Sequence, residues 1–260
     1  MPRTPRRLCD LRTVFRLKAE GLSDREISRL TSIPINTIRT WRNGRVPDYA
    51  RASIPARAPT DVELDRFDRA AVASDIYAYL LGVYLGDGCL TPNGNSWSLR
   101  ISLDQRYPGI IGACCHAIES ITGRRPSPTP HPGGARCVVI QSTWAPWIVL
   151  FPQHGPGRKH LRRIELHEWQ LKVVEDAPGL FLRGLIHTDG WRSVNRVHVK
   201  GKDYEYPRYQ FSNRSDDIRR LFTDACDALG VQWRRWARYH ISVARRESVA
   251  LLDSFIGPKA

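Results

Sequence analysis

Two apolar stretches that end in the same way stand out in the hydrophobic pattern of the chain. Residues 80–88 read LLGVYLGDG, and residues 182–190 read LRGLIHTDG, 102 positions later (182 − 80). Each stretch predicts a buried helix that ends at Asp-Gly, because glycine readily adopts the left-handed turn that terminates helices. One copy alone would indicate only a buried, capped helix. Two copies predict a repeated unit and a repeated site.

Small residues recur four positions apart in each stretch. They are Gly82 and Gly86 in the first, and Gly184 and Thr188 in the second. This spacing lets two helix backbones touch, so we expect the two helices to pack together and their terminal acids, Asp87 and Asp189, to lie side by side. Adjacent carboxylates repel unless a cation joins them. Together with helix carbonyls, they are the oxygen ligands that Mg²⁺ accepts.

The pattern that follows each stretch is also repeated. The first is followed by strand-like segments at 96–103 and 136–142 and helical segments at 110–122 and 145–151. The second is followed by strand-like segments at 208–213 and 231–243 and helical segments at 215–229 and 249–255. One αββαββα-like unit is therefore written twice, which predicts an α+β fold with internal pseudo-twofold symmetry.

Both apolar stretches resemble the LAGLIDADG motif of homing endonucleases, in which the eighth position is the functional acid. The copies depart from the consensus at their second, sixth and seventh positions, and none of these changes removes Asp87 or Asp189. The resemblance implies a monomeric, pseudo-twofold domain whose saddle-shaped antiparallel sheets lie along the major groove of double-stranded DNA. It also implies that the two acids bind Mg²⁺, or Mn²⁺ as a substitute, for strand cleavage. The carbonyls of Gly86 and Thr188 would complete the metal shells.

A lysine follows each acid at nearly the same distance. Lys159 lies 72 residues after Asp87 (159 − 87), and Lys259 lies 70 residues after Asp189 (259 − 189). The two lysines are therefore expected to be symmetry mates. The resemblance implies that a basic residue near the scissile phosphate assists catalysis. Contact with the DNA backbone or with solvent alone is the equally weighted alternative.

Basic and polar residues alternate in the strand-like stretches that would face DNA. In the second unit we expect most of the even-numbered members to share one face: Arg196, His198, Lys200, Lys202, Tyr204, Arg208 and Gln210. Ser98 and Arg100 are the less charged counterparts in the first unit. Arginine and glutamine can read base edges, whereas lysine mostly pairs with phosphate. A solvated sheet face is the simpler alternative.

Residues 22–44 resemble a helix-turn-helix of the homeodomain-like or resolvase-like kind. Ser23 and Glu26 form a predicted capping box, and residues 10–20 would be the supporting first helix. The predicted inward residues are Ile27, Leu30, Ile38 and Trp41. The predicted DNA-contacting residues are Thr37, Arg39, Thr40, Arg42 and Asn43, because an exposed polar helix after a tight turn suits the major groove. A small helical hairpin without a nucleic-acid role is the alternative.

Composition agrees with a nucleic-acid partner. The 260 residues contain 40 Lys and Arg against 26 Asp and Glu, a net charge of +14, although membranes and acidic proteins also attract basic chains. No apolar run is long enough to span a bilayer, and the start lacks the core of a signal peptide, so we expect a cytoplasmic, nucleoid-associated protein that is not secreted. The six cysteines form no CxxC pair, which indicates neither a zinc site nor a disulfide framework.

The expected organisation is a helix-turn-helix module at 1–44, a Pro-, Ala- and Arg-rich linker at 45–60, and an endonuclease domain at 61–260. Its repeats would span about 74–159 and 164–260. The expected function is site-specific, metal-dependent cleavage of both DNA strands. The alternative is a non-catalytic transcriptional regulator on the same scaffold, and intron RNA is a further alternative partner. The acid pair favours the nuclease, because a scaffold kept only for binding has no chemical need for aspartate at both helix ends.

Overall fold

The computed structural model describes residues 8–43, 72–93, 96–131, 136–155, 157–199, 201–257 and 259. The chain divides into two compact units, one formed by residues 1–58 with 154–162 and the other by residues 59–153 with 163–260. The predicted linker at 45–60, and Lys200 among the predicted DNA contacts, fall outside the described residues. Within those residues, no helix combines the length and the apolar character needed to cross a membrane.

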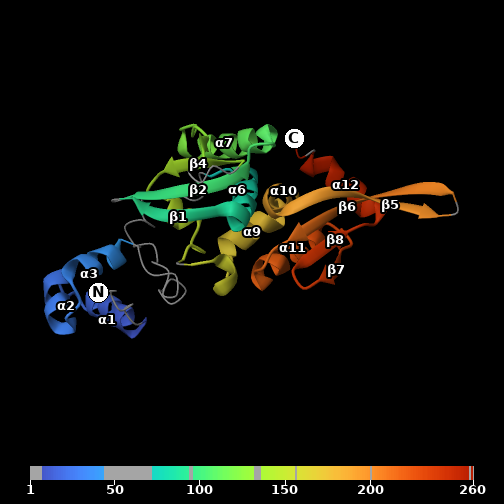
Figure 1. Cartoon of the computed structure of the whole chain (residues 1–260). Coiled ribbons are helices and arrows are strands. Elements are labelled where there is room, and N and C mark those ends of the chain that lie inside the picture. Colours follow the sequence, from blue (N-terminus) through green and yellow to red (C-terminus); the bar gives the residue numbers. More distant parts are fainter. Residues whose placement is uncertain are drawn as a thin grey trace. The chain divides into compact units, whose positions relative to one another are not determined.

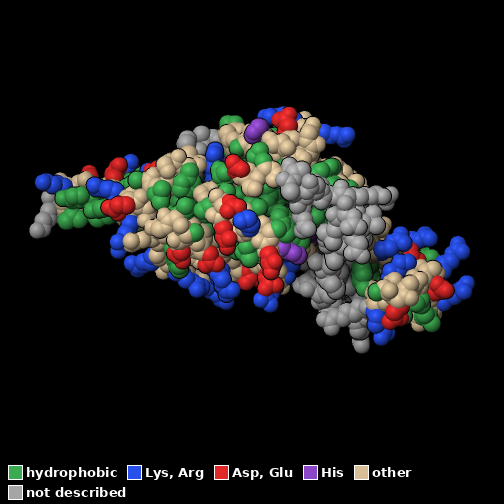
Figure 2. Space-filling view, turned by 180° about the vertical axis from the view of Figure 1, so that it is seen from behind, with side chains coloured by type: hydrophobic (Ala, Val, Ile, Leu, Met, Phe, Trp, Pro, Cys, Tyr) green, Lys and Arg blue, Asp and Glu red, His purple; other side chains and the backbone are tan. Residues whose placement is uncertain are grey.

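The first unit contains helices α1 (Leu8–Ala19), α2 (Asp24–Thr31) and α3 (Ile35–Arg42). The predicted capping box is confirmed: the Ser23 backbone N–H donates to the Glu26 carboxylate at 2.7 Å, and the Glu26 N–H donates to Ser23 Oγ at 3.3 Å. This cap satisfies backbone donors that would otherwise be unpaired at the start of α2. Basic side chains gather on the outside of this unit (Figure 2).

A small apolar core holds these helices together. It contains Val14, Ile27, Ile33, Ile38 and Trp41. The predicted inward position of Leu30 is wrong, because its side chain is 67 % exposed. The chain turns at Ser32, which adopts a left-handed conformation with φ 55°, and this turn places Ile33 in the core instead of Leu30.

The second unit confirms the α+β class and the predicted duplication. The first repeat contains α6 (Ser74–Asp87), β1 (Gly88–Asn93), β2 (Ser96–Asp104), α7 (Pro108–Thr122), β3 (Thr129–Pro130), β4 (Cys137–Thr143) and α8 (Trp147–Leu150). The second repeat contains α10 (Pro178–Asp189), β5 (Gly190–Val199), β6 (Lys202–Ser212), α11 (Asp216–Ala228), β7 (Arg234–Ala237), β8 (His240–Val243) and α12 (Arg246–Ile256). Helix α9 (Glu168–Asp176) lies between the repeats in sequence.

The two antiparallel sheets of the described residues have the same strand order. It is β1-β2-β4-β3 in the first repeat and β5-β6-β8-β7 in the second. Helices α6 and α10 lie between the sheets (Figure 1). Each sheet packs one face against helices, as shown by the parallel stacking of Phe211 in β6 on Phe222 in α11, with ring centroids 4.2 Å apart.

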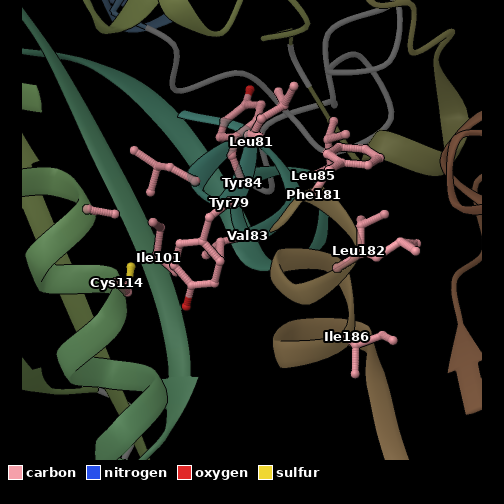
Figure 3. Packing of buried hydrophobic residues seen from close by; sticks show 14 of the residues in the cluster. Tyr79, Leu81, Val83, Tyr84, Leu85, Ile101, Cys114, Phe181, Leu182 and Ile186 are labelled. Carbon is pink, nitrogen blue, oxygen red and sulfur yellow. The ribbon is translucent and has the colours of Figure 1, made fainter. Parts of the chain in front are cut away.

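The α6–α10 pair forms the centre of the core. Figure 3 shows Tyr79 and Val83 of α6 directed toward Ile101 of β2 and Cys114 of α7, whereas Leu182 and Ile186 of α10 lie on the other side. All of these side chains are buried. Apolar residues therefore surround α6 on nearly every side, as expected for a helix in the interior of a domain.

The predicted close packing of the two motif helices is confirmed by their glycines. A Cβ atom on Gly82 would lie 2.4 Å from the Phe181 carbonyl oxygen, and one on Gly184 would lie 2.2 Å from the Tyr79 carbonyl oxygen. Real Cβ atoms do not approach other heavy atoms so closely, so each helix presents bare backbone to the other. The contact continues to the helix ends, where a Cβ on Gly86 would meet Thr188 Oγ1 at 2.0 Å.

The predicted left-handed turn at the end of each motif is wrong. Gly88 has φ −85° and Gly190 has φ −109°, both in extended conformation, so each helix passes directly into a strand. Glycine is needed here for space. A Cβ on Gly88 would lie 2.7 Å from the Cα of Tyr84, and one on Gly190 would lie 2.7 Å from the Cα of Ile186.

We predict that Gly184→Ala lowers the free energy of unfolding by roughly 3 kcal/mol, because the added methyl group forces the two helix backbones apart. Urea denaturation measures this change. Gly112→Ala in α7 is the matched control, since no atom lies within 4 Å of its added Cβ. It should stabilise the chain by about 0.5–1 kcal/mol through helix propensity. Equal effects of the two substitutions would contradict the close helix contact.

Candidate active site

Asp87 and Asp189 are the last residues of α6 and α10. The contact between Gly86 and Thr188, one position before each acid, places the two helix ends together. The Asp87 side chain is exposed and that of Asp189 is half-buried. Because helix C-termini carry partial negative charge, the two carboxylates and the two helix ends make this region strongly negative.

Lys259 brings a positive charge to the same region. Its Nζ donates a hydrogen bond to the carbonyl oxygen of Gly190, which directly follows Asp189. The ammonium group also lies 5.5 Å from the ring centroid of Tyr107. Burial lowers the pKa of Lys259, and the carboxylates of Asp87, Asp189 and Asp104 act in the opposite direction. Both motif acids therefore lie within electrostatic range of one ammonium group.

Asn213 is a site residue that the sequence analysis missed. Its Nδ2 donates to Asp189 Oδ2 at 2.6 Å, and its own Oδ1 accepts from the Ser215 backbone N–H at 2.8 Å. The buried Arg219 guanidinium donates to the Asn213 carbonyl. These contacts hold the Asn213 amide in place and fix the orientation of the Asp189 carboxylate.

Asp104 lies in the corresponding region of the first repeat, at the end of β2. Hydrogen bonds from Arg106 lower the pKa of Asp104 to about 2, and the two groups form an ion pair at 2.6 Å. A signal for Asp104 and Asn213 was present in the sequence. An antiparallel hairpin that starts directly after a helix returns to the end of that helix, so the last residues of its second strand must approach the motif acid.

His187, at the sixth position of the second motif, has a structural role. Its Nε2 lies 3.2 Å from the Ile256 carbonyl oxygen, and its Nδ1 lies 3.1 Å from the Tyr79 hydroxyl. Because a carbonyl can only accept, Nε2 carries the proton and Nδ1 accepts from Tyr79. Burial lowers the pKa of His187 to about 4, so the ring is neutral at pH 7. It connects α10 with α6 and with the end of α12, which precedes Lys259.

The other predicted lysine, Lys159, lies in a short 3-10 helix, Lys159–Leu161. This segment belongs to the first compact unit, whereas Lys259 belongs to the second. The predicted symmetry of the two lysines therefore stays a prediction.

The donor chemistry at the helix ends fits a hydrated divalent cation. Mg²⁺ is held by one or two carboxylates while it keeps several waters, and Asp87 and Asp189 offer two carboxylates beside the carbonyl groups of Gly86 and Thr188. No group of three His, Cys, Asp or Glu residues that could enclose a metal occurs in the described part of the chain. The residues present therefore suit a hard, hydrated ion better than a metal held entirely by protein ligands.

The expectation that most even-numbered polar residues of the second sheet share one face holds for those of β6 but does not extend to those of β5. In the β5–β6 hairpin, Gly190 pairs with Phe211 and Val199 pairs with Lys202, so every pair joins an even to an odd residue. Paired residues point to the same face of a sheet. Even-numbered residues of the two strands therefore point to opposite faces. Two residues connect β5 with β6. Because this number is even, even-numbered residues of β5 pair with odd-numbered residues of β6.

Arg196 and His198 lie on the side of the sheet that carries the helices, and each contacts a carboxylate group. Arg196 pairs with Glu205 at 2.8 Å, and His198 Nδ1 lies 2.7 Å from an Asp203 carboxylate oxygen. The opposite face of the sheet is called the open face here. Three of the predicted DNA contacts belong to it by register: Lys202, Arg208 and Gln210.

Two residues of the open face, Ser193 and Tyr206, were not among the residues predicted to face DNA. Gln210 Nε2 donates to Ser193 Oγ at 3.1 Å. The rings of Tyr204 and Tyr206 are stacked with centroids 6.4 Å apart, and both side chains are exposed. The register assigns Ser193 and both tyrosines to the open face. These residues share a face because the length of the β5–β6 turn sets which residues of the two strands pair.

Ser98 in the first sheet does not fit its predicted role as an exposed contact. Its side chain is 3 % exposed, and its hydroxyl is 2.8 Å from Thr143 Oγ1. Asn93 of the neighbouring strand β1 also donates to this hydroxyl, at 3.3 Å. Arg100 is half-buried two positions further along the same strand, so it lies on the same face. It stays a predicted contact.

In the first unit, four of the five predicted contacts on α3 are exposed, namely Arg39, Thr40, Arg42 and Asn43, while Thr37 is half-buried. The structure adds Asp24, which the sequence analysis did not identify. Its carboxylate lies 2.9 Å from Arg42 Nη1 and 3.9 Å from Arg39 Nε. Asp24 therefore restrains two of the arginines that α3 presents.

No family model and no curated protein sequence matches this chain. Among solved structures, the chain is similar to the LAGLIDADG meganuclease I-AabMI bound to uncleaved DNA, with 13 % identity, coverage of 69 % of this chain and 82 % of that chain, and a TM-score of 0.43. It is also similar to I-DmoI in complex with DNA and Mn, with 15 % identity, coverage of 71 % and 98 %, and a TM-score of 0.44. A third similar structure is I-SmaMI bound to an uncleaved DNA target in the presence of calcium ions, with 10 % identity, coverage of 70 % and 84 %, and a TM-score of 0.44.

Proposed function

We propose that this chain is a site-specific, metal-dependent DNA endonuclease of the LAGLIDADG homing type that cuts both strands of a duplex. The observation that carries the proposal is the convergence of Asp87, Asp189 and Lys259 where two tightly packed helices end. A pair of acids held together beside a half-buried ammonium suits phosphodiester hydrolysis. Because one chain contains both repeats, it would act as a monomer on a roughly palindromic site.

In this proposal Asp87 and Asp189, with the carbonyls of Gly86 and Thr188, hold Mg²⁺ or Mn²⁺. Such ions lower the pKa of water and neutralise charge on phosphoryl oxygens. Lys259 stabilises negative charge that develops at the scissile phosphate, and Lys159 is proposed to do so for the other strand.

Asn213 would act in this chemistry as a positioning residue for Asp189. Its hydrogen bond keeps the Asp189 carboxylate in one orientation. A fixed carboxylate loses less orientational freedom when it engages a cation or substrate, which is how positioning groups lower reaction barriers.

The duplex would lie along the open face of the second sheet and the corresponding face of the first. Lys202 would contact phosphate, and Arg208 and Gln210 would contact base edges in the major groove. Helix α3 of the first unit would act as the recognition helix of a helix-turn-helix, with its arginines on DNA next to the cleavage site. Two DNA-binding units on one chain raise each other's effective concentration. The proposed location is the cytoplasm, in association with the nucleoid.

We predict that purified protein with Mg²⁺ or Mn²⁺ cuts both strands of a site in a DNA library that includes the DNA flanking its own gene. Asp87→Asn and Asp189→Asn should each lower the cleavage rate by about two orders of magnitude or more, because each removes a charged group that acts at the scissile phosphate. Gel electrophoresis and end sequencing measure the cuts.

Asp176→Asn is the matched control for these variants, because it removes an exposed aspartate at the end of another helix, α9. It should cut like the wild type. Tight, specific DNA binding without cuts at any metal concentration would refute the nuclease proposal and leave the transcriptional regulator. Preference for intron transcripts over duplex DNA would instead point to RNA as the partner.

We predict that Arg208→Ala weakens binding to the cleaved duplex about tenfold, because a specific arginine–base contact contributes roughly 1–3 kcal/mol. Arg196→Ala is the matched control, since Arg196 is on the opposite face and pairs with Glu205. It should change the Kd by less than about twofold. Fluorescence anisotropy with a labelled duplex measures both. A larger loss for Arg196→Ala would show that the duplex lies on the other face.

A further inference from the structure

Three aromatic rings form a row on the open face of the second sheet, at the end nearest the motif acid. Trp191 is the second residue of β5 and follows Asp189 by two positions. Its ring centroid lies 6.4 Å from that of His240 in β8, and His240 lies 5.0 Å from Trp236 in β7. The Trp236 side chain is 53 % exposed. We call these three side chains the aromatic row.

The strand register places the row on the side of the sheet away from the helices. Trp191 pairs with Gln210, and His240 pairs with Ser212. Both partners are even-numbered residues of β6, whereas the residue between them, Phe211, packs on α11. The rings are therefore not part of the domain core.

Polar groups beside the row lack partners. Arg208 Nε, His240 Nδ1 and Ser242 Oγ are shielded from bulk solvent and have no hydrogen-bond partner among the described residues. All three side chains belong to the open face by register. Buried polar atoms in folded proteins nearly always have a partner. Three such atoms around one row of rings therefore indicate a surface that is completed by a ligand.

The charge around the row favours an anionic ligand. Residues 232–246, which include β7 and β8, contain five arginines and no aspartate or glutamate. One of them, Arg235, donates to the carbonyl oxygens of Ala237 and Arg238. These bonds stabilise the irregularity in the β7–β8 pairing between Arg235 and Ala237. Trp236 is the residue at this irregularity.

The described residues of the first repeat form no equivalent row. Ile101 pairs with Ile140 in the first sheet as Phe211 pairs with Ile241 in the second. Cys89 therefore corresponds to Trp191, and Val139 corresponds to His240. Since both repeats form the same sheet, the fold does not require rings at these positions. The row is a feature that the second repeat has in addition to the scaffold.

We propose that the aromatic row is a binding site for unpaired bases of a single-stranded nucleic acid. A duplex offers base edges and phosphates to a protein, because its base faces are stacked on one another. An unpaired strand exposes flat faces, which stack on tryptophan and histidine rings while arginines attract its phosphates. Single-stranded DNA and RNA share this chemistry. The row shares the open face with the proposed duplex contacts, and base stacking on it needs no metal ion.

The test uses the full-length chain in EDTA, so that cleavage plays no part. Fluorescence anisotropy measures the Kd for labelled dT12, labelled rU12 and a 12-base-pair duplex. Trp236→Leu should raise the Kd for single strands about tenfold, because one stacking contact is lost, while Trp236→Phe should restore most of the affinity. The duplex should be affected by less than twofold.

Trp233→Leu is the matched control. Trp233 is similarly exposed, at 37 %, but its indole N–H donates to Asp227 and it is outside the row. A loss confined to rU12 would identify RNA as the ligand, and one confined to dT12 would identify unpaired DNA. The proposal is overturned if the wild type does not bind single strands, if Trp236→Leu leaves their Kd unchanged, or if Trp233→Leu or the duplex shows an equal loss.

Discussion

The direct contact between the backbones of α6 and α10 is the constraint on which the rest of the second unit depends. Gly82 and Gly184 leave no room for even a methyl group at the crossing. A larger residue at either position would separate the helices and, with them, the acids at their ends. The same contact fixes where the sheets begin, because β1 and β5 start at the residue after each acid. Site geometry and sheet placement thus share one physical origin.

The two repeats keep this common frame but differ on their surfaces. Their strand orders are identical, yet the β5–β6 hairpin is longer than the β1–β2 hairpin and carries exposed tyrosines. Near the acids, the second repeat has an amide, Asn213, whereas the first has the ion-paired Asp104 one register position further along. An asymmetric surface on a symmetric frame suits a target whose two halves differ in sequence.

The sequence was sufficient to predict the features that depend on local patterns. The small residues in the motifs identified the helix contact, and the repeated pattern predicted the duplication. The Ser23–Glu26 capping box could also be predicted, because its two residues lie within one helical turn of each other. Lys259 was found by its spacing from Asp189, and the structure places its ammonium near both acids. Its role in catalysis remains a prediction.

The errors concern features that depend on pairing between strands or on space. Alternation along a strand cannot show which residues share a face with the next strand, because the turn length sets that register. Arg196 and His198 were therefore grouped with Lys202, Arg208 and Gln210, although they lie on the opposite face. Gly88 and Gly190 look like helix terminators in the sequence, but the structure shows that they avoid collisions with Tyr84 and Ile186. Asn213 was missed because its proximity to Asp189 arises only when the hairpin folds back.

The central claim is that the helix contact creates one cation site from the two motif acids. Electron paramagnetic resonance of free Mn²⁺ measures how many ions the protein binds and how tightly. We expect wild-type protein, with duplex DNA present, to bind Mn²⁺ in a way that the Asp87→Asn/Asp189→Asn double variant loses and the Asp176→Asn variant keeps. Unchanged Mn²⁺ binding by the double variant would contradict the account.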